Sequence, residues 1–392
     1  MIRRRRVFFI AGFDPRGPAF YHASYRSEAA QQSRTQQAAD GASYDVSDAQ
    51  AEGLHLLGWS VQARIGAQQV DTRYSYLAWD DIAQGLVPRG AGVWLAALVQ
   101  FWRRHLGQGG HAASWRLARR WAWALLSLPI YLAGAACVVV LAAGLAGVAG
   151  AQAGAAMGWL AGAAAGLCLA WYAWRLALRW NLVWLTHALN GSYAWALGEV
   201  PALDARLEGF SRQIAEALAP QDAQEPDDEV LLVGHCMGAM LGAVLMAQVA
   251  GHCAAHPERL ARLKFLTLAS PMANYALLRG DVRVADALRT LAAMDIDWLD
   301  YTAPQDPLCY FLVDALRAIG IPDAQRRVRL RLRSARYDKM VAPDTMARIR
   351  HDPLLLHFQY LLATHRPVPN DFCALTAGPI PLAQRVQEAP PA

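Results

Sequence analysis

Short apolar runs recur near both ends of the chain and are separated by segments whose apolar residues have helical spacing. Such runs are typical of buried strands, whereas the spacing in residues 200–218 and from about 236 to 255 predicts helices. Residues 24–50, rich in Gln, Ser and Ala, are predicted to form a helix and then a loop. The predicted strands cover residues 6–11, 54–65, 72–79, 229–233, 264–269, 296–301 and 328–334.

This alternation of strands with helices predicts an α/β fold with a mainly parallel sheet and helices on both faces. Neither end of the chain has enough strands to close a core alone, so we expect the two ends to fold together. The predicted organisation is a first part of the sheet domain at 1–115, an inserted segment at 116–180, and a second part of the sheet domain at 181–392.

The inserted segment is strongly apolar. From Trp121 to Trp174 the chain contains no Asp, Glu, Lys or Arg. One bilayer crossing needs about 20 residues, so this stretch is long enough for two. We predict a transmembrane hairpin of two helices, at about 121–148 and 153–174, with the lipid bilayer as its partner.

Arginines flank the hairpin on both sides, and the positive-inside rule therefore places both flanks in the cytoplasm. The expected location is the cell inner membrane, with two spans and a cytoplasmic folded domain. The flanking arginines are Arg103, Arg104, Arg116, Arg119 and Arg120 before the hairpin, and Arg175 and Arg179 after it.

Four glycines, Gly154, Gly158, Gly162 and Gly166, recur at every fourth position of the second predicted span. This spacing places them on one helix face, where they allow another backbone to approach closely. The face could pack against the first span, or it could support self-association of two chains. Both readings stay open at this point.

Composition agrees with a membrane protein. Hydrophobic residues make up 55% of the 392 residues and charged residues only 18%, which is too apolar for an ordinary soluble enzyme. The net charge is +5, but Lys264 and Lys339 are the only lysines. We interpret this arginine bias as a GC-rich genome, so no nucleic-acid partner is expected. The six cysteines show no metal-like spacing, and we expect neither a metal site nor a cofactor.

One segment combines a strand, a tight turn and a helix around a cysteine. Residues 229–241 read EVLLVGHCMGAML, in which Gly234 and Gly238 flank Cys236 at two residues on either side. Small residues at these positions are what a nucleophile elbow requires, because the turn is sharp and bulk there would collide with neighbouring backbone. The Cys236 side chain would then project at a helix N-terminus, where the dipole favours a thiolate.

This motif resembles the G-H-S-M-G elbow of lipase- and esterase-like members of the α/β-hydrolase superfamily. Gly234, His235, Met237 and Gly238 match it, and Cys236 replaces the serine. Cysteine elbows also occur in dienelactone hydrolases and polyhydroxyalkanoate synthases. The resemblance covers roughly residues 6–80 and 203–376. It implies a triad whose nucleophile, acid and base follow in that order along the chain.

The implied order limits the candidates for the acid. Asp306 follows a predicted strand and is our first choice, with Asp300 and Asp295 as alternatives.

Three histidines lie beyond these acids and can therefore serve as the base: His357, which we favour, then His351 and His365. His235 is adjacent to the nucleophile but points elsewhere in the turn, so we expect it to be a packing residue.

The resemblance also implies an oxyanion hole made of two backbone N–H groups. One donor would be Met237, directly after the nucleophile. The other would come from the loop at 11–17, after the first strand, with Phe13 as the donor.

Together these features lead us to expect a membrane-anchored acyl hydrolase. It would attack an ester or thioester of a lipid-like or long-chain acyl substrate through Cys236 and resolve an acyl-enzyme with water. An acyltransferase with the same triad and a scaffold protein without catalysis are the alternatives.

Overall fold

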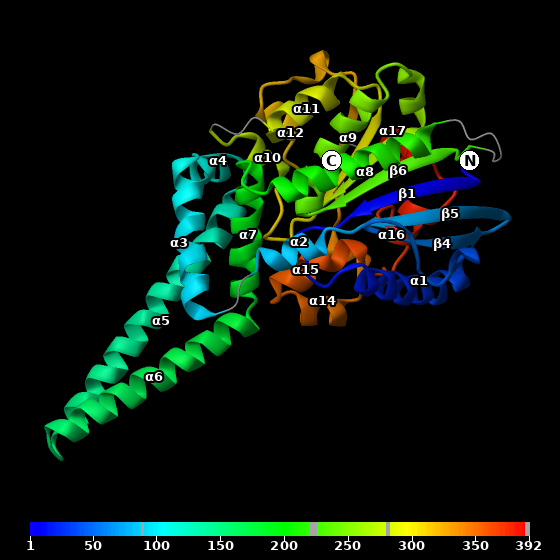
Figure 1. The fold of residues 1–392 in the computed structure, drawn as a ribbon. Coiled ribbons are helices and arrows are strands. Elements are labelled where there is room, and N and C mark those ends of the chain that lie inside the picture. The colour runs from blue at the N-terminus through cyan, green and yellow to red at the C-terminus, as the bar shows by residue number, and fades with distance from the viewer. Residues whose placement is uncertain (88–89, 220–225, 280–282, 389–392) are drawn as a thin grey trace.

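A computed structural model describes residues 1–87, 90–219, 226–279 and 283–388. Within them, nine strands form a single sheet in the order β2-β4-β5-β1-β6-β7-β8-β9, with β3 paired to β4 (Figure 1). Strands β5, β1, β6, β7, β8 and β9 run parallel, whereas β4 is antiparallel to β5, β2 and β3. The strands are β1 (Arg4–Ile10), β2 (Ser43–Val46), β3 (Gln50–Gly53), β4 (Leu56–Ile65), β5 (Gln68–Leu77), β6 (Glu229–His235), β7 (Leu263–Leu268), β8 (Asp297–Thr302) and β9 (Arg329–Ser334).

The two ends of the chain share this sheet. Strand β1 lies between β5 and β6, so that Val7 is in register with Tyr74 on one side and Leu231 on the other. Every residue of β6 is buried, as a central parallel strand covered on both faces should be. The α/β architecture with a mainly parallel sheet is therefore present as predicted.

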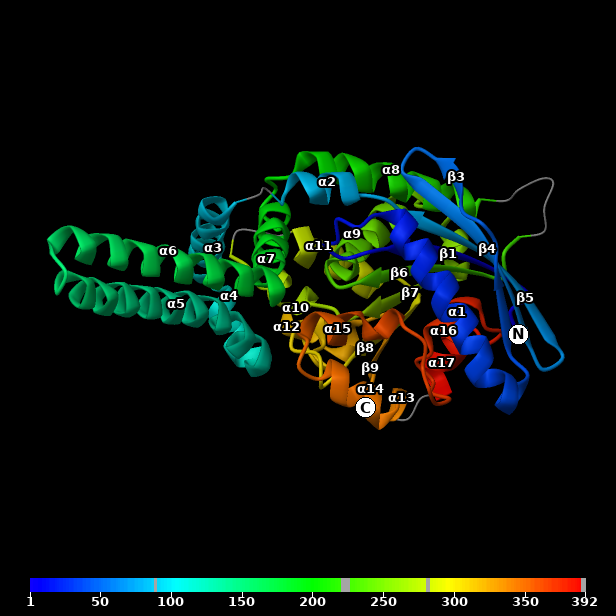
Figure 2. The same cartoon turned by 90° about the horizontal axis from the view of Figure 1, so that it is seen from below.

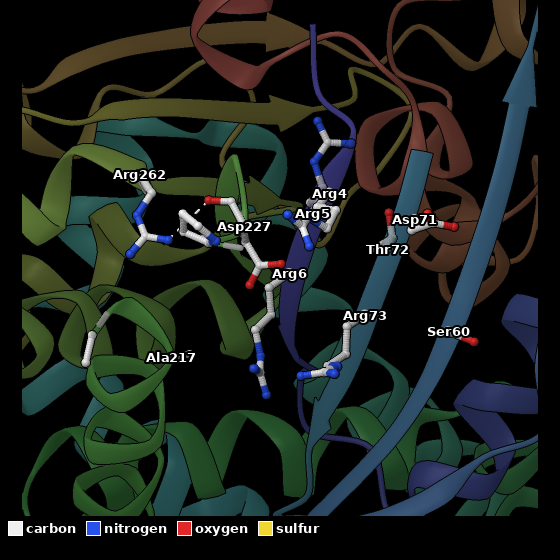
Figure 3. A pocket seen from close by; sticks show the side chains of 12 residues that line it. Arg4, Arg5, Arg6, Ser60, Asp71, Thr72, Arg73, Ala217, Asp227 and Arg262 are labelled. Carbon is white, nitrogen blue, oxygen red and sulfur yellow. Dashed lines mark hydrogen bonds between the residues drawn. The ribbon is translucent and has the colours of Figure 1, made fainter. Parts of the chain in front are cut away.

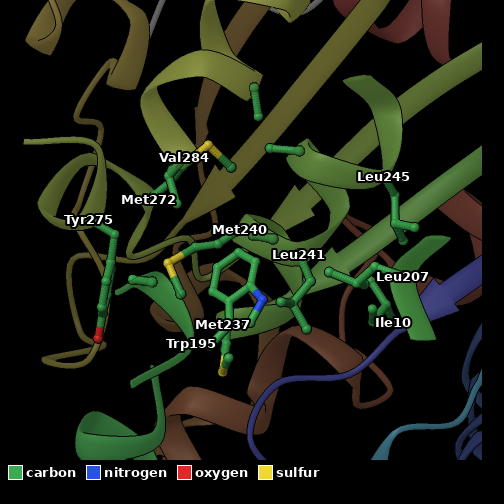
Figure 4. Close-up of a cluster of buried hydrophobic side chains, with 14 of the residues drawn as sticks. Ile10, Trp195, Leu207, Met237, Met240, Leu241, Leu245, Met272, Tyr275 and Val284 are labelled. Atoms are coloured by element: carbon green, nitrogen blue, oxygen red, sulfur yellow. The ribbon is translucent and has the colours of Figure 1, made fainter. Parts of the chain in front are cut away.

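Each face of the sheet has its own hydrophobic core, because side chains alternate along the strands. Phe8 belongs to one core and Phe9 to the other. The first core includes Trp195, Met237 and Leu241, which Figure 4 shows packed together. The helices over the first core are α2 (Asp80–Gly85), α3 (Ala91–Gly107), α7 (Leu182–Ala196), α8 (Pro201–Leu218), α9 (Met237–His252), α10 (Met272–Ala276), α11 (Arg283–Ala293) and α12 (Ala315–Ala318).

The second core lies under α1 and the helices of the C-terminal part (Figure 2). These helices are α1 (Pro18–Asp40), α13 (Tyr337–Met340), α14 (Pro343–Ile349), α15 (Pro353–Phe358), α16 (Phe372–Ala377) and α17 (Leu382–Glu388). Short 3₁₀ turns cover Pro257–Arg262, Asp323–Gln325 and Gln359–Leu361.

Two long helices project from the body as a hairpin: α5 (Arg119–Ala151) and α6 (Ala155–Arg179) (Figure 1). By length and composition both could cross a membrane, and almost none of either apolar stretch is buried inside the protein. They correspond to the spans predicted at 121–148 and 153–174, each somewhat longer than expected. A short helix, α4 (Gly110–Leu117), joins α3 to α5.

The glycine face of α6 is turned toward α5. A Cβ atom added to Gly158 would lie 2.8 Å from the Gly147 oxygen, and one added to Gly162 would lie 2.9 Å from the Ala143 oxygen. Gly166 also faces Ala143, whereas Gly154 lies in the turn with open space around it. The glycines thus allow close packing within the hairpin. Self-association through this face stays a prediction, and it would compete with α5 for the same surface.

The prediction for residues 24–50 was incomplete. The helix is present as α1, but the expected loop contains the short strand β2, and β3 begins at its last residue; both strands pair with β4. Strand β3 is exposed along its whole length, and β2 has only four residues. Neither has the apolar run by which the other strands were recognised.

Replacing Gly162 with leucine should separate α5 from α6, because the larger side chain would collide with backbone of the neighbouring helix. We expect a destabilisation of about 1–3 kcal/mol, the usual range for overpacking, seen as a lower midpoint of thermal unfolding in detergent. Gly134→Leu is the matched control, since a side chain at Gly134 of α5 meets nothing within 4 Å. Equal midpoints for the two variants would contradict this packing.

Candidate active site

Cys236 occupies a strained turn between β6 and α9. Its backbone has φ 57° and ψ −125°, a region that residues with a side chain rarely adopt and that costs about 1–3 kcal/mol. Two hydrogen bonds hold the turn: the Cys236 N–H donates to the Leu268 carbonyl, and the Ala239 N–H donates to the Cys236 carbonyl, both at 2.9 Å. This is the geometry expected of a nucleophile elbow.

The two elbow glycines are sterically required. A Cβ atom on Gly234 would lie 2.4 Å from the Gly238 oxygen, and one on Gly238 would lie 2.1 Å from the Ile10 oxygen. These separations are far shorter than any real contact, and the atoms met are backbone. The spacing of glycines around Cys236 therefore reflects the close approach of α9 to β1 and β6.

The loop after β1 passes directly beside the cysteine. A Cβ atom on Gly12 would lie 2.7 Å from Cys236 Cβ and 3.3 Å from its Sγ. Gly12 and Cys236 are thus in contact. The two predicted oxyanion donors, Phe13 and Met237, are the residues that directly follow them in the chain. The Phe13 ring is buried against Trp79, with ring centroids 6.0 Å apart.

This loop is held in place by Asp14. The buried carboxylate accepts hydrogen bonds from the Arg16 side chain and, at 2.8 Å, from the Tyr21 hydroxyl. The Arg16 guanidinium in turn lies 3.9 Å from the centroid of the Phe20 ring and 4.6 Å from that of Phe358. The loop beside Cys236 is thereby tied both to α1 and to α15.

His357 of α15 is paired with Asp306, which follows β8. The His357 Nδ1 and Asp306 Oδ2 atoms are 2.9 Å apart, and both side chains are fully buried. Two further donors fix the carboxylate: the Leu308 N–H at 2.8 Å on Oδ1 and the Tyr360 hydroxyl at 3.1 Å on Oδ2. With Nδ1–H donating to Asp306, the Nε2 atom is left to exchange a proton with another group.

Cys236 is the group with which His357 Nε2 can exchange a proton. Burial alone would lower the pKa of His357, but the Asp306 carboxylate and then Cys236 raise it, and the net pKa lies well above the ordinary value. Within the described residues Nε2 is buried and makes no hydrogen bond of standard geometry. Cys236 is therefore close enough to His357 to raise the pKa of the imidazole, although the contact does not meet the criteria of a standard hydrogen bond.

His235 supports the base from the other side. Its Nε2 atom lies 2.9 Å from the His357 carbonyl oxygen and donates to it, and the two rings have centroids 4.9 Å apart. Burial and then the charge of His357 lower the pKa of His235 to about 3, so this ring is neutral. His235 is therefore the packing residue that we expected, and it also anchors the backbone of α15.

The alternative bases are placed elsewhere. His351 is exposed, and its Nε2 accepts a hydrogen bond from Arg350. His365 accepts one from the Ala342 N–H through Nδ1.

The alternative acids also have other partners. Asp295 forms a surface ion pair with Arg329. Asp300 is buried in β8 and accepts a hydrogen bond from the Thr267 hydroxyl. Among the three candidate acids, Asp306 is the one that contacts His357.

Some residues of the site were not singled out from the sequence. Gly12 was treated as part of a loop and not as a contact of the thiol. Tyr360, whose hydroxyl both donates to Asp306 and accepts from the Ala303 N–H, lies three residues after His357. That spacing puts two side chains on one helical face and could have indicated it.

The surroundings of Cys236 differ from those of the other cysteines. Cys236 is partly exposed, whereas Cys253, Cys309 and Cys373 are buried, and Cys137 and Cys168 lie exposed on the two long helices. In the part of the chain that the structure describes, no group of three or more His, Cys, Asp or Glu side chains is placed to hold a metal ion.

An apolar cavity of about 200 Å³ opens beside α15. Phe358, the residue after His357, forms part of its wall, and Arg16 and Phe20 lie at its edge. Its other lining residues are Phe9, Tyr21, Ser24, Tyr25, Trp59, Tyr74, Leu354, Leu355, Leu361, Leu362 and Phe372.

No protein-family model, curated protein or solved structure matches this chain. The geometry of the site therefore has to carry the functional argument by itself.

Burial makes Asp300 a pH-dependent element of the core. Burial raises the pKa of this carboxyl from 3.8 to about 7. Between these pH values the carboxyl is therefore protonated in the folded state and ionised in the unfolded state. Stability should therefore fall as pH rises from 4 to 7, by at most about 4 kcal/mol from this group. Asp300→Asn should raise the unfolding midpoint at pH 7.5 and lose this advantage near pH 4. A variant less stable than the parent at pH 7.5 would refute this reading.

Proposed function

We propose that the protein is a membrane-anchored acyl hydrolase that cleaves ester or thioester bonds through a Cys236–His357–Asp306 triad. The observation that carries this proposal is the coincidence of a strained elbow cysteine with a buried histidine–carboxylate pair. Strained backbone costs free energy and persists where the surrounding structure enforces it, most often at functional sites. A merely structural cysteine in this turn would need neither the strain nor a base beside it.

The topology supports an α/β-hydrolase-like fold. The candidate nucleophile follows β6, the acid follows β8 and the base follows β9, which is the chain order that the resemblance implies. The strand that precedes the candidate oxyanion loop, β1, is the direct neighbour of β6. All these loops leave the carboxyl ends of parallel strands and so meet at one edge of the sheet.

The chemistry proposed is two-step acyl transfer to water. The Cys236 thiolate attacks the carbonyl carbon, and the resulting oxyanion is stabilised by the Met237 and Phe13 N–H groups, each contributing on the order of 3 kcal/mol. The imidazolium of His357 protonates the departing alcohol or thiol, leaving a thioester on Cys236. His357 then takes a proton from water, whose oxygen attacks the thioester, and the thiolate is released. Asp306 fixes the imidazole tautomer and stabilises its charged form.

The membrane hairpin is joined directly to this site. Helix α6 leads into α7, and the Ser192 hydroxyl of α7 donates to Met237 Sδ at 3.2 Å. A Cβ atom on Gly191 of the same helix would lie 2.6 Å from the Phe13 ring. Both residues proposed for the oxyanion hole thus pack against α7, the helix that follows the second proposed span, which suits a substrate drawn from the membrane. The proposed orientation keeps the sheet domain in the cytoplasm, on the arginine-flanked side of the inner membrane.

The apolar cavity beside α15 supports a long-chain acyl substrate. Its aromatic and leucine lining suits a hydrocarbon chain, and its wall includes the residue next to the proposed base. We propose that the acyl tail lies there while the carbonyl carbon lies at Cys236 Sγ, with the carbonyl oxygen directed at the Met237 and Phe13 N–H groups.

Selective alkylation tests the proposed triad. Because the pKa of His357 is raised, its charged imidazolium should lie beside the Cys236 sulfur near neutral pH and promote alkylation of that sulfur. Mass mapping of iodoacetamide adducts on the detergent-solubilised protein at pH 6.5 should show Cys236 reacting first, and His357→Gln should slow that reaction at least about tenfold. The difference should shrink toward pH 9, where thiolates form without assistance.

His351→Gln is the matched control for this experiment, because it removes an exposed histidine from the same segment and should leave the rate unchanged. Ester hydrolysis should fall at least about 10³-fold in Cys236→Ala and His357→Gln. Slow labelling of Cys236 that is indifferent to His357 would favour a scaffold without catalysis.

Chain-length preference tests the position of the acyl tail. Leu355 lies at the exposed edge of the apolar cavity. Leu355→Asp should lower kcat/KM for twelve- to sixteen-carbon esters at least about tenfold, since a carboxylate at the mouth of the cavity opposes the burial of an apolar chain beside it. The same variant should hydrolyse acetyl esters at the parental rate. An equal loss for short and long esters would place the tail elsewhere.

A further inference from the structure

A second cavity, of about 290 Å³, opens at the opposite end of the sheet from Cys236, where β1 begins (Figure 3). Its described lining contains five arginines but only two carboxylates, those of Asp71 and Asp227. The lining residues are Arg4, Arg5, Arg6, Ser60, Asp71, Thr72, Arg73, Ala217, Ala219, Pro226, Asp227 and Arg262.

Two of the arginines stand side by side. Arg6 of β1 is in register with Arg73 of β5, which is in register with Ser60 of β4. Residues in register on neighbouring strands point to the same face, and Figure 3 shows both guanidinium groups reaching into the cavity. Like charges in such a pair repel and are destabilising unless an anion lies between them.

Within the described residues, other arginines of the cavity are bonded to protein acceptors, whereas the contact given for the Arg6 guanidinium is the Phe8 ring, 5.2 Å from its centroid. Arg5 is bonded to Glu229 and to the Gly378 and Ile380 carbonyls, and Arg262 donates to the Leu218 and Asp227 carbonyls. The guanidinium groups of Arg5 and Arg262 are therefore satisfied by hydrogen bonds within the protein.

Among the described residues, by contrast, neither Arg6 nor Arg73 forms an ion pair, and the buried Arg6 Nε has no hydrogen-bond partner. Burial and then the charge of Arg73 lower the pKa of Arg6. Glu52 and Asp227 are the nearest acids acting on Arg6, and the Glu52 carboxylate already accepts from Ser75.

We propose that Arg6 and Arg73 form a binding site for the phosphate group of a small soluble ligand, with the Ser60 hydroxyl as a further donor. Paired guanidinium forks match the geometry of phosphate oxygens better than any other common anion contact. The cavity lies at the far end of the sheet from α5 and α6, so a free phosphate compound reaches it and a lipid headgroup of the same bilayer does not (Figure 1). This inference is independent of the proposed hydrolysis.

Calorimetric titration of the full chain in detergent with inorganic phosphate, at constant ionic strength, tests the site. We expect saturable binding of one phosphate, weakened at least tenfold by Arg73→Gln and less by Arg73→Lys. Without phosphate, Arg73→Gln should melt no lower than the parent, since it removes a like-charge contact; this shows that the loss of binding is not a loss of fold.

Arg331→Gln, which removes an exposed arginine of the edge strand β9, is the matched control and should bind phosphate as the parent does. Absence of binding by the parent protein, or an equal loss in Arg331→Gln, would overturn the proposal. So would a requirement for phosphatidic acid in nanodiscs, because the ligand would then be a lipid and not a soluble phosphate.

Discussion

The parallel pairing of β1 with β6 is the interaction on which the rest of the structure depends. It aligns Arg5 through Ile10 with Glu229 through Gly234, across an insertion that contains both long apolar helices. Because the two strands end together, the loop after β1 and the turn after β6 leave the sheet at the same point. Gly12 consequently touches Cys236, and Gly238 touches Ile10. The pairing thus supplies the contact of the loop after β1 with the strained cysteine, in addition to the hydrogen bond of Cys236 to Leu268 of β7.

The pairing also explains why the insertion is tolerated. Helices α3 and α7 pack over the first core, so the chain leaves the body and returns to it on one side of the sheet. The hairpin of α5 and α6 then projects without interrupting any strand pair. Helix α7 couples the two regions, since it contacts both Phe13 and Met237. Helix α7 thereby links the hairpin to the two residues proposed for the oxyanion hole.

Much of this arrangement could be predicted from sequence because it rests on local patterns. Buried strands can be recognised from their apolar runs, and the two glycines around Cys236 have the spacing that a tight strand-to-helix turn requires. Strands β2 and β3 were not predicted because each has only four residues; β3 is exposed along its length, and β2 buries only Tyr44 and Val46. An alternation over four residues, as in β2, is too short to be distinguished from a loop, and β3 has no alternation of buried and exposed residues.

The identity of the histidine partner required tertiary information. His351 and His357 lie on either side of the turn that begins α15, and both follow the candidate acid in the chain. His357, and not His351, contacts Asp306 because α15 packs over the end of β8. The contact of His235 with the His357 carbonyl reinforces that choice and has no signature in the sequence.

Trapping the acyl-enzyme tests the central claim most directly. The detergent-solubilised protein would be mixed with a p-nitrophenyl acyl ester, quenched in acid within a turnover, digested and analysed by mass spectrometry. The account predicts an acyl group on the peptide containing Cys236 and on no other cysteine peptide, and its disappearance as hydrolysis completes. An unmodified Cys236 during ester turnover, or acylation spread over several cysteines, would contradict it.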